Sequence, residues 1–214
     1  MYITDRGNNR VQLWNTGTSI GTTTAGGTLN ISLNGPTTII RDSITGIVYI
    51  SDTYNHQIVS YPSGTVVAGG KSAGHSNTQL YNPFGLVFDS TTQSFPIPNY
   101  DTNEIVRWVL SAHNWTHVAG NINGSAGSDS SSLYHPVGIT IDPMGTIYIA
   151  DARNHRIQFF LAGKSNGTTI AGITDVSGND STLLYSSYWV ALDNQLNLYV
   201  SDTFNHRVQK FLRY

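Results

Sequence analysis

The 214-residue sequence contains no cysteine, which excludes disulfide bonds, thiolate zinc sites and cysteine nucleophiles. Charge is also scarce. Asp, Glu, Lys and Arg make up 11% of the residues, less than half of the roughly 25% found in an average soluble domain. Long exposed helices and coiled coils need charged side chains to solvate a whole face, so folds built from them are not expected.

The sequence also lacks a basic excess and a long apolar segment. Its net charge is −2, whereas binding to nucleic acids or membrane surfaces generally needs a positive excess. No apolar run approaches the roughly 18 residues of a membrane-spanning helix. The N-terminal segment 1–5 has neither a basic stretch nor an apolar run, so we expect no signal peptide and no membrane partner. The compartment stays open between extracellular and cytoplasmic.

What the sequence does contain is a repeat. One motif, approximately Asp-x-x-Asn-His-Arg-Ile, occurs in four good copies and one degraded copy. The copies are Asp5–Val11, Asp52–Ile58, Tyr100–Val106, Asp151–Ile157 and Asp202–Val208. The Asn residues 8, 55, 103, 154 and 205 lie 47, 48, 51 and 51 residues apart. A period near 50, with 21 glycines and 11% aromatics, indicates a β-propeller or a related array of short strands.

Each period carries four strand-like pieces, here called a, b, c and d. Strand a follows a proline, as at Pro36, Pro83 and Pro136, and strand b ends at the Asp of the motif. Strand c follows the motif's turn, and strand d ends in Ala-Gly. Strands a and b are continuous apolar runs, as expected where neighbouring blades cover both faces of a sheet. We therefore predict an all-β propeller of four-stranded antiparallel blades.

These motifs resemble the NHL-repeat family of β-propellers. The resemblance rests on the Pro-x-Gly-Ile/Leu start of strand a, the Tyr-Ile/Val-Ser/Ala-Asp end of strand b and the segment Ala150–Ile157. It implies a six-bladed ring, whereas the sequence supplies about four and a half to five blades. We expect a fragment of a larger propeller, forming a single domain over residues 1–214. Its pieces would be a partial blade 1–26, blades 36–69, 83–120 and 136–172, and a partial blade 187–214.

The third period departs from the pattern. Pro96 and Pro98 fall where strand b is expected, and both would remove N–H donors from the same ladder. Tyr100 stands where the other copies have the turn Asp. We predict a distorted second strand in this blade.

In an antiparallel blade the b–c turn and the d–a connection lie at the same end, so they share one rim of a propeller. That rim carries every copy of the motif and the longest connections, 70–82, 121–135 and 173–187. Long connections without their own secondary structure are often functional. The rim candidates for binding are Tyr81, Tyr134, Tyr185, His75, Asp129 and Asp180. The tyrosines could instead pack the connections against neighbouring blades, and the two Asp residues lack the spaced ligands of a calcium loop.

The motif residues themselves are predicted to be structural, because a catalytic group is needed once and not in every blade. Their carboxylate and amide oxygens can accept backbone N–H bonds and fix a tight turn. The Arg after the His is expected to pair with a neighbouring Asp and orient one blade against the next. This structural set comprises Asp5, Asn8, Asp52, Asn55, His56, Asp151, Asn154, His155, Arg156, Asp202, Asn205, His206 and Arg207.

Motif searches favour a binding protein over an enzyme. The sequence has no nucleophile elbow, phosphate-binding loop or His-Glu-x-x-His motif. His113 and His117 would straddle a hairpin turn, so we predict no metal site and no cofactor. The predicted function is a non-enzymatic propeller that binds a protein or peptide, monomeric unless sheet edges pair. The NHL resemblance implies target recognition in a ubiquitin ligase or an extracellular sensor role.

Two alternatives come from the same family resemblance. One is a metal-dependent lyase for peptidyl-α-hydroxyglycine, which would need axial histidines that the strand-a segments lack. The other is RNA binding through Arg6, Arg10, Arg153, Arg156 and Arg207, which would lie on one rim. Because each of these arginines has a turn Asp close by, nucleic acid is the less favoured partner.

Overall fold

The computed structural model describes residues 1–212, which form an all-β chain of antiparallel sheets. Residues 213 and 214, part of the expected last partial blade, lie outside the described residues. Across the described chain, none of the helical segments has the length and apolar character needed to cross a bilayer. The chain forms two compact units, Met1–Phe95 with Trp108–Trp115, and Pro96–Arg107 with the residues from Thr116 onward. The expectation of a single domain with the stated blade bounds stays a prediction.

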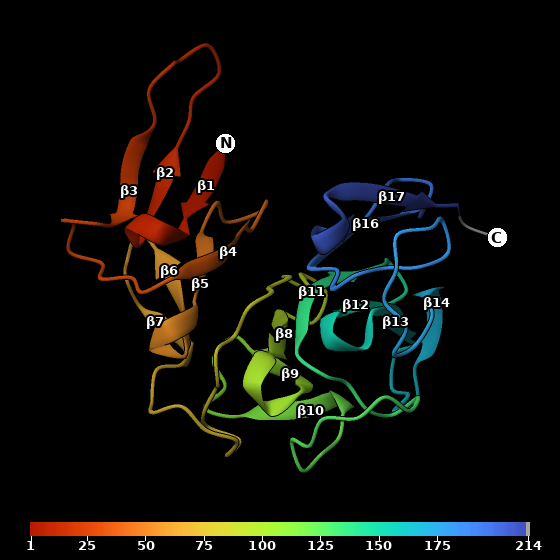
Figure 1. Ribbon diagram of the computed structural model, residues 1–214. Helices are drawn as coiled ribbons and strands as arrows, with labels where there is room; N and C mark the ends of the chain where they lie inside the picture. The colour runs from red at the N-terminus through yellow and green to blue at the C-terminus, as the bar shows by residue number, and fades with distance from the viewer. Residues whose placement is uncertain (213–214) are drawn as a thin grey trace. The chain divides into compact units, whose positions relative to one another are not determined.

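The first unit contains a three-stranded sheet, β1-β2-β3, and a four-stranded sheet, β4-β5-β6-β7 (Figure 1). Every neighbouring pair is antiparallel, so each sheet is a meander of consecutive strands. The strands are β1 (Tyr2–Asp5), β2 (Arg10–Leu13), β3 (Thr22–Gly26), β4 (Pro36–Arg41), β5 (Val48–Asp52), β6 (Gln57–Tyr61) and β7 (Val66–Gly69).

The second unit repeats this plan with a four-stranded sheet, β11-β12-β13-β14, and a three-stranded sheet, β15-β16-β17. Its strands are β11 (Pro136–Ile141), β12 (Ile147–Asp151), β13 (Arg156–Phe160), β14 (Thr168–Gly172), β15 (Trp189–Leu192), β16 (Leu198–Asp202) and β17 (Arg207–Phe211). The four-strand pattern read from the sequence is confirmed for this sheet and for β4–β7.

The third repeat forms a three-stranded sheet, β10-β9-β8, and the boundary between the two units falls within it. Its strands are β8 (Ser94–Asn99), β9 (Glu104–Val109) and β10 (Trp115–Gly120). The prediction of a distorted second strand is wrong, because β8 is continuous and buried throughout. The missing strand is the first. Residues 84–88 form no strand, and the segment keeps only isolated bridges at Pro83 and between Asp89 and Ser94.

The two prolines explain why the first strand of this repeat is missing and the second is present. The backbone nitrogens of Pro96 and Pro98 both lie on the edge of β8 that faces the position of strand a, and neither carries an N–H to donate. The other side of β8 keeps its donors and pairs with β9. The prolines therefore prevent hydrogen-bonded pairing between β8 and strand a, and β8 itself stays intact.

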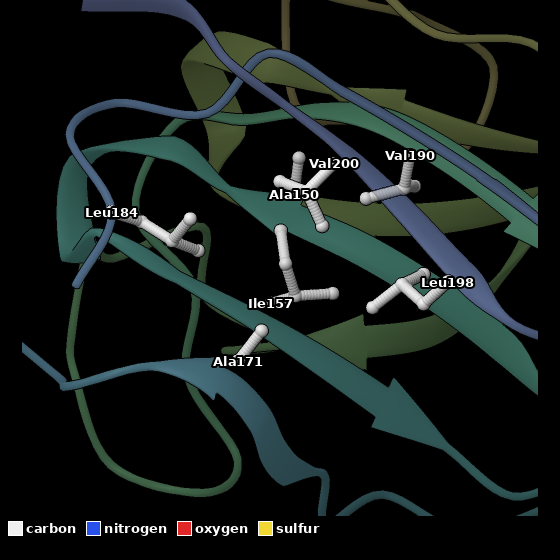
Figure 2. Close-up of a cluster of buried hydrophobic side chains, with 7 residues drawn as sticks. All are labelled: Ala150, Ile157, Ala171, Leu184, Val190, Leu198 and Val200. Carbon is white, nitrogen blue, oxygen red and sulfur yellow. The ribbon is translucent and has the colours of Figure 1, made fainter. Parts of the chain in front are cut away.

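Each unit has an apolar core between its sheets. In the second unit this core joins sheets β11–β14 and β15–β17, and its side chains point toward one another in Figure 2. Its buried members are Ala150, Ile157, Ala171, Leu184, Val190, Leu198 and Val200. The first unit has the equivalent core of Val11, Ala25, Leu33, Val48, Ile50 and Val59. Burial between sheets explains the continuous apolar runs, because both faces of an inner strand are covered.

Candidate binding surface at the corner ends of the sheets

Each strand that corresponds to strand b of the repeat (β1, β5, β8, β12 and β16) runs into a single 3-10 turn before the next strand begins. We call the six residues from the end of this strand to the start of the next a corner. The corners are Asp5–Arg10, Asp52–Gln57, Asn99–Glu104, Asp151–Arg156 and Asp202–Arg207, and they contain the turns η1 (Arg6–Asn8), η2 (Thr53–Asn55), η3 (Tyr100–Thr102), η4 (Ala152–Asn154) and η5 (Thr203–Asn205).

The fifth residue of each corner has a left-handed backbone. These residues are Asn9, His56, Asn103, His155 and His206, with φ between 51° and 55°. Asn and His tolerate this region better than most residues with a Cβ atom. The motif's Asn or His at this position therefore follows from the turn geometry.

The first residue of a corner is the acceptor that organises it. In the fourth corner Asp151 Oδ2 accepts from Asn154 Nδ2 and Arg156 Nε, both at 2.8 Å. Asp151 Oδ1 accepts from the backbone N–H of Tyr134, at 2.7 Å. Because Tyr134 ends the connection that leads into this sheet, the carboxylate joins the turn to its incoming loop.

Arg156 completes this network from a buried position. Its guanidinium donates to the carbonyl oxygens of Ser128, Asp129 and Ser132, all in the incoming connection. Only 3% of its side chain is exposed, and Asp151 is fully buried. The expected pairing with a neighbouring Asp is confirmed, and the expected orientation of one blade against the next stays a prediction. Arg156 pairs with the Asp of its own corner and fixes the loop that precedes its sheet.

The same network recurs with small changes. In the fifth corner Asp202 accepts from Asn205, Arg207 and the N–H of Tyr185. In the second corner Gln57 replaces the arginine and donates to Asp52 at 2.8 Å. In the first corner Asp5 accepts from Asn8 and Arg10. In these corners the Asp and Asn residues predicted to be structural, with Arg10, Arg156 and Arg207, thus form contacts that hold the turns.

The third corner has its acceptor moved to the opposite end. Asn99 takes the place of the Asp, and Glu104 takes the place of the Arg. Asn99 Nδ2 and Thr102 Oγ1 both donate to Glu104 Oε1, at 3.1 and 2.7 Å. The sequence alignment of Tyr100 with the turn Asp is therefore wrong by one residue. The corner begins at Asn99, and Asn103 is its left-handed residue.

The left-handed residue connects each corner to the next connection along the chain. Asn9 Oδ1 accepts from the N–H of Gly35, and His56 Nδ1 accepts from the N–H of Asn82. The equivalent pairs in the second unit are Asn103 with His135 and His155 with Ser186. All four donors also have a left-handed backbone. In the described chain the Asn or His side chain at this position thus links one repeat to the following one.

This contact predicts a pH dependence of stability. His155 Nδ1 is an acceptor only in the neutral ring, and burial lowers the pKa of His155, with Arg153 adding to and Asp175 opposing the effect. A histidine with a lowered folded pKa stabilises the fold above its unfolded value of about 6.5, and this contribution is lost as the pH falls below that value.

We therefore expect His155→Asn to reduce the loss of stability between pH 7.5 and 5.5, since Asn makes the same contact at Asn9 without titrating. Urea unfolding at both pH values measures this. His206→Asn makes the same substitution at the equivalent exposed position and serves as the matched control. An unaltered pH dependence in His155→Asn would contradict the assignment.

Of the predicted binding candidates, Asp129 and Asp180 serve the loops that contain them. Asp129 Oδ1 accepts from the N–H and hydroxyl of Ser131, and Asp180 Oδ1 does the same for Thr182. The side-chain hydrogen bond from Thr182 is the main cause that lowers the pKa of Asp180. His75 is partly buried and lies beside Trp115, with ring centroids 6.1 Å apart. Within residues 1–212, no group of three His, Asp or Glu side chains is placed to hold a metal ion.

The exposed aromatic side chains all belong to the corners or to the ends of the connections that dock on them. Within residues 1–212 they are Tyr54, Tyr81, Tyr134, Tyr185, Tyr188 and Phe204. The sequence identified Tyr81, Tyr134 and Tyr185, but not the other three. Tyr54 and Phe204 occupy the third position of a corner, which is variable in the motif and therefore gave no repeat signal.

These rings rest on the polar contacts described above. Tyr81 packs edge-on against His56, and Tyr185 packs edge-on against His155, each with centroids 5.6 Å apart. Tyr185 also lies 5.2 Å from Phe204, and Phe204 lies 6.1 Å from Tyr188. In each unit exposed aromatic side chains thus pack on a hydrogen-bonded histidine at the corner ends of the sheets.

Comparison with known proteins identifies the repeat. The sequence profile of the NHL repeat matches residues 133–160 and 190–211, which contain the fourth and fifth corners. NHL repeat-containing protein 2 of Bos taurus is 33% identical over 91 residues, covering 37% of this chain and 12% of that protein. The chain carries NHL repeats. Because the match spans so little of the cattle protein, the likeness extends to the NHL repeats and not to the rest of that protein.

Solved structures place the NHL blades in the β-propeller class. The structure of a nidogen/laminin complex matches with a TM-score of 0.72 at 17% identity, over 99% of this chain and 75% of that chain. An auxiliary nutrient binding protein of Bacteroides thetaiotaomicron matches with a TM-score of 0.69 at 16% identity, over 95% of this chain and 53% of that one. Virginiamycin B lyase of Staphylococcus aureus matches with a TM-score of 0.61 at 11% identity, over 99% and 66%. At these identities the likeness shows the fold alone, and the chain spans about half of the nutrient binding protein.

Proposed function

We propose that this NHL chain is a non-enzymatic binding module that holds a protein or peptide on the corner ends of its blades. The observation that supports the proposal is the position of the exposed aromatics, which in residues 1–212 all lie on corners or on the connections that dock there. Tyr and Trp supply large contact areas at low entropic cost and are enriched in recognition surfaces. The corner carboxylates and the rings of His56 and His155 beneath several of these aromatics are already hydrogen-bonded, so binding requires little reorganisation of those corners.

A protein-binding role for such a module is supported by one structural neighbour. One solved structure of this fold is a nidogen/laminin complex, in which a propeller engages another protein. A module of this kind would be one part of a longer protein and would recognise the target of that protein. The longer protein would be either a ubiquitin ligase or an extracellular sensor. In a ligase, the zinc-binding RING would have to lie in another segment, because this chain has no cysteine.

The arginines of the corners are engaged within the fold, which disfavours the RNA-binding alternative. Arg10, Arg156 and Arg207 donate to the Asp of their own corners, and Arg156 and Arg207 also donate to loop carbonyl oxygens. Arg6 lies over aromatic rings. Phosphate contacts need available guanidinium groups, so protein is the preferred partner class.

Affinity capture with the full chain as bait tests the proposal. A rim variant carrying Tyr134→Ala, Tyr185→Ala and Phe204→Ala should lose at least about ten-fold in partner recovery, since aromatic hot spots contribute about 2 kcal/mol or more. The matched control, Met144→Ala with Leu161→Ala, removes two exposed apolar side chains at the opposite end of sheet β11–β14 and should retain the partner. Equal recovery by all three baits, or loss only in the control, would contradict the proposal.

A further inference from the structure

The first unit shows how this chain combines arginine with aromatic rings at a corner. The guanidinium carbon of Arg6 lies 5.3 Å from the ring centroid of Tyr54 and 5.2 Å from that of Phe84. Arg6 Nη2 also donates to the hydroxyl of Tyr54. These are cation–π distances, so one guanidinium serves two ring faces.

The same three repeat positions recur in the second unit. Arg6 is the second residue of its corner, Tyr54 is the third residue of the next corner, and Phe84 follows the residue that begins strand a one repeat later. Two repeats further on, these positions hold Tyr100, Arg153 and Tyr188. Arg153 forms a side-chain hydrogen bond with Tyr100. The arginine here occupies the position of Tyr54, the tyrosine occupies that of Arg6, and the two side chains still pair.

At the fourth corner this arrangement loses its arginine. The second residue is Ala152, whose side chain ends at Cβ, and the third residue of the next corner is Phe204. Phe204 forms a continuous group with Tyr185 and Tyr188, here called the aromatic patch. The three rings are 51%, 42% and 36% exposed, respectively. Among the side chains of residues 1–212, no Lys or Arg lies over these rings.

An exposed carboxylate lies beside the patch. Asp175 acts electrostatically on His155, and the His155 ring packs edge-on against Tyr185. Asp175 has no ion-pair partner among the residues that the structure describes. A cation on the patch would therefore meet ring faces and an available counter-charge together. Arg153 also acts on His155, and its side chain is engaged by Tyr100.

We propose that the aromatic patch, with Asp175 at its edge, binds the guanidinium of an arginine in a partner peptide. This inference rests on the proposed function and specifies the partner as an arginine-bearing segment. The bound guanidinium would meet Phe204 as Arg6 meets Tyr54, because Phe204 and Tyr54 are both the third residue of their corners. Arginine is preferred to lysine because a planar, weakly hydrated guanidinium stacks on aromatic faces better than an ammonium does.

An NMR titration of the full chain with the peptide Ac-Gly-Ser-Arg-Ser-Gly-NH2 tests the inference. We expect saturable shifts of the Phe204 and Tyr188 amides, and binding at least about three-fold weaker when citrulline or lysine replaces arginine. Phe204→Ala should weaken binding by the same factor. Ala152→Arg should abolish it by supplying a guanidinium from the chain itself. Tyr81→Ala removes an exposed aromatic outside the patch and should bind like the unmodified chain.

Equal affinity for the arginine and citrulline peptides, or an equal loss in Tyr81→Ala and Phe204→Ala, would overturn the inference. Circular dichroism of each variant confirms that the sheets are intact. Should the arginine peptide fail to bind while partner capture still depends on the exposed aromatics, the inference is wrong and the proposed function stands. Should capture fail to depend on them as well, both are wrong.

Discussion

Replacing Arg156 with alanine is expected to lower the free energy of unfolding by about 3–5 kcal/mol, the usual cost of leaving one partner of a buried ion pair alone. Asp151 would be left buried without its cation. The carbonyl oxygens of Ser128, Asp129 and Ser132 would lose their donors at the same time. Chemical denaturation measures the loss, and hydrogen exchange should show faster opening of the connection 121–135.

Two variants separate the buried pair from its position in the repeat. Arg156→Gln should be less damaging, because Gln57 already donates to Asp52 at the equivalent place in the second corner. Arg10→Ala removes the same contact where the arginine is 34% exposed, and water can replace much of it. If Arg10→Ala were as destabilising as Arg156→Ala, burial would not be the cause.

Replacing Gly172 with alanine is expected to cost about 3 kcal/mol or more. Gly172 ends β14 with φ +78°, a region that costs a residue with a Cβ about 1–2 kcal/mol. An added Cβ would also overlap the carbonyl oxygen of His155, which forces the strand away from β13 and adds the cost of overpacking. Thermal or urea unfolding gives the total.

Gly163→Ala is the matched control for this substitution. Gly163 has φ +73°, but a Cβ there would meet no heavy atom within 4 Å. Gly163→Ala should therefore lower the free energy of unfolding only by the cost of the left-handed backbone, about 1–2 kcal/mol. The difference between the two variants measures the steric term, and equal losses would show that the close approach to His155 does not matter.

Much of the fold could be predicted from the sequence because the same turn residues recur in each repeat. The Ala-Gly end of strand d recurs at Gly26, Gly69, Gly120 and Gly172, and all four have positive φ and a backbone carbonyl where a Cβ would lie. The Asp and Asn of the corners accept and donate as their chemistry requires. Local turn chemistry of this kind is visible in a single chain.

Features that depend on partners far apart in sequence could not be predicted in the same way. The contact between His155 Nδ1 and the N–H of Ser186 spans 31 residues and depends on two left-handed backbones meeting. The third corner was misaligned because its carboxylate moved from the first position to Glu104, which reverses donor and acceptor while keeping the turn. Tyr54 and Phe204 were missed because the motif leaves their position variable.

The most direct test of the account is a hydrogen-exchange footprint of the chain with the partner recovered by capture. The account predicts protection in peptides that contain the corners and the ends of the connections, above all residues 183–189 and 202–207. Peptides from the opposite end of the blades, such as 142–146 and 161–167, should exchange as they do in the free chain. Protection confined to 142–146 and 161–167, with residues 183–189 and 202–207 unchanged, would contradict it.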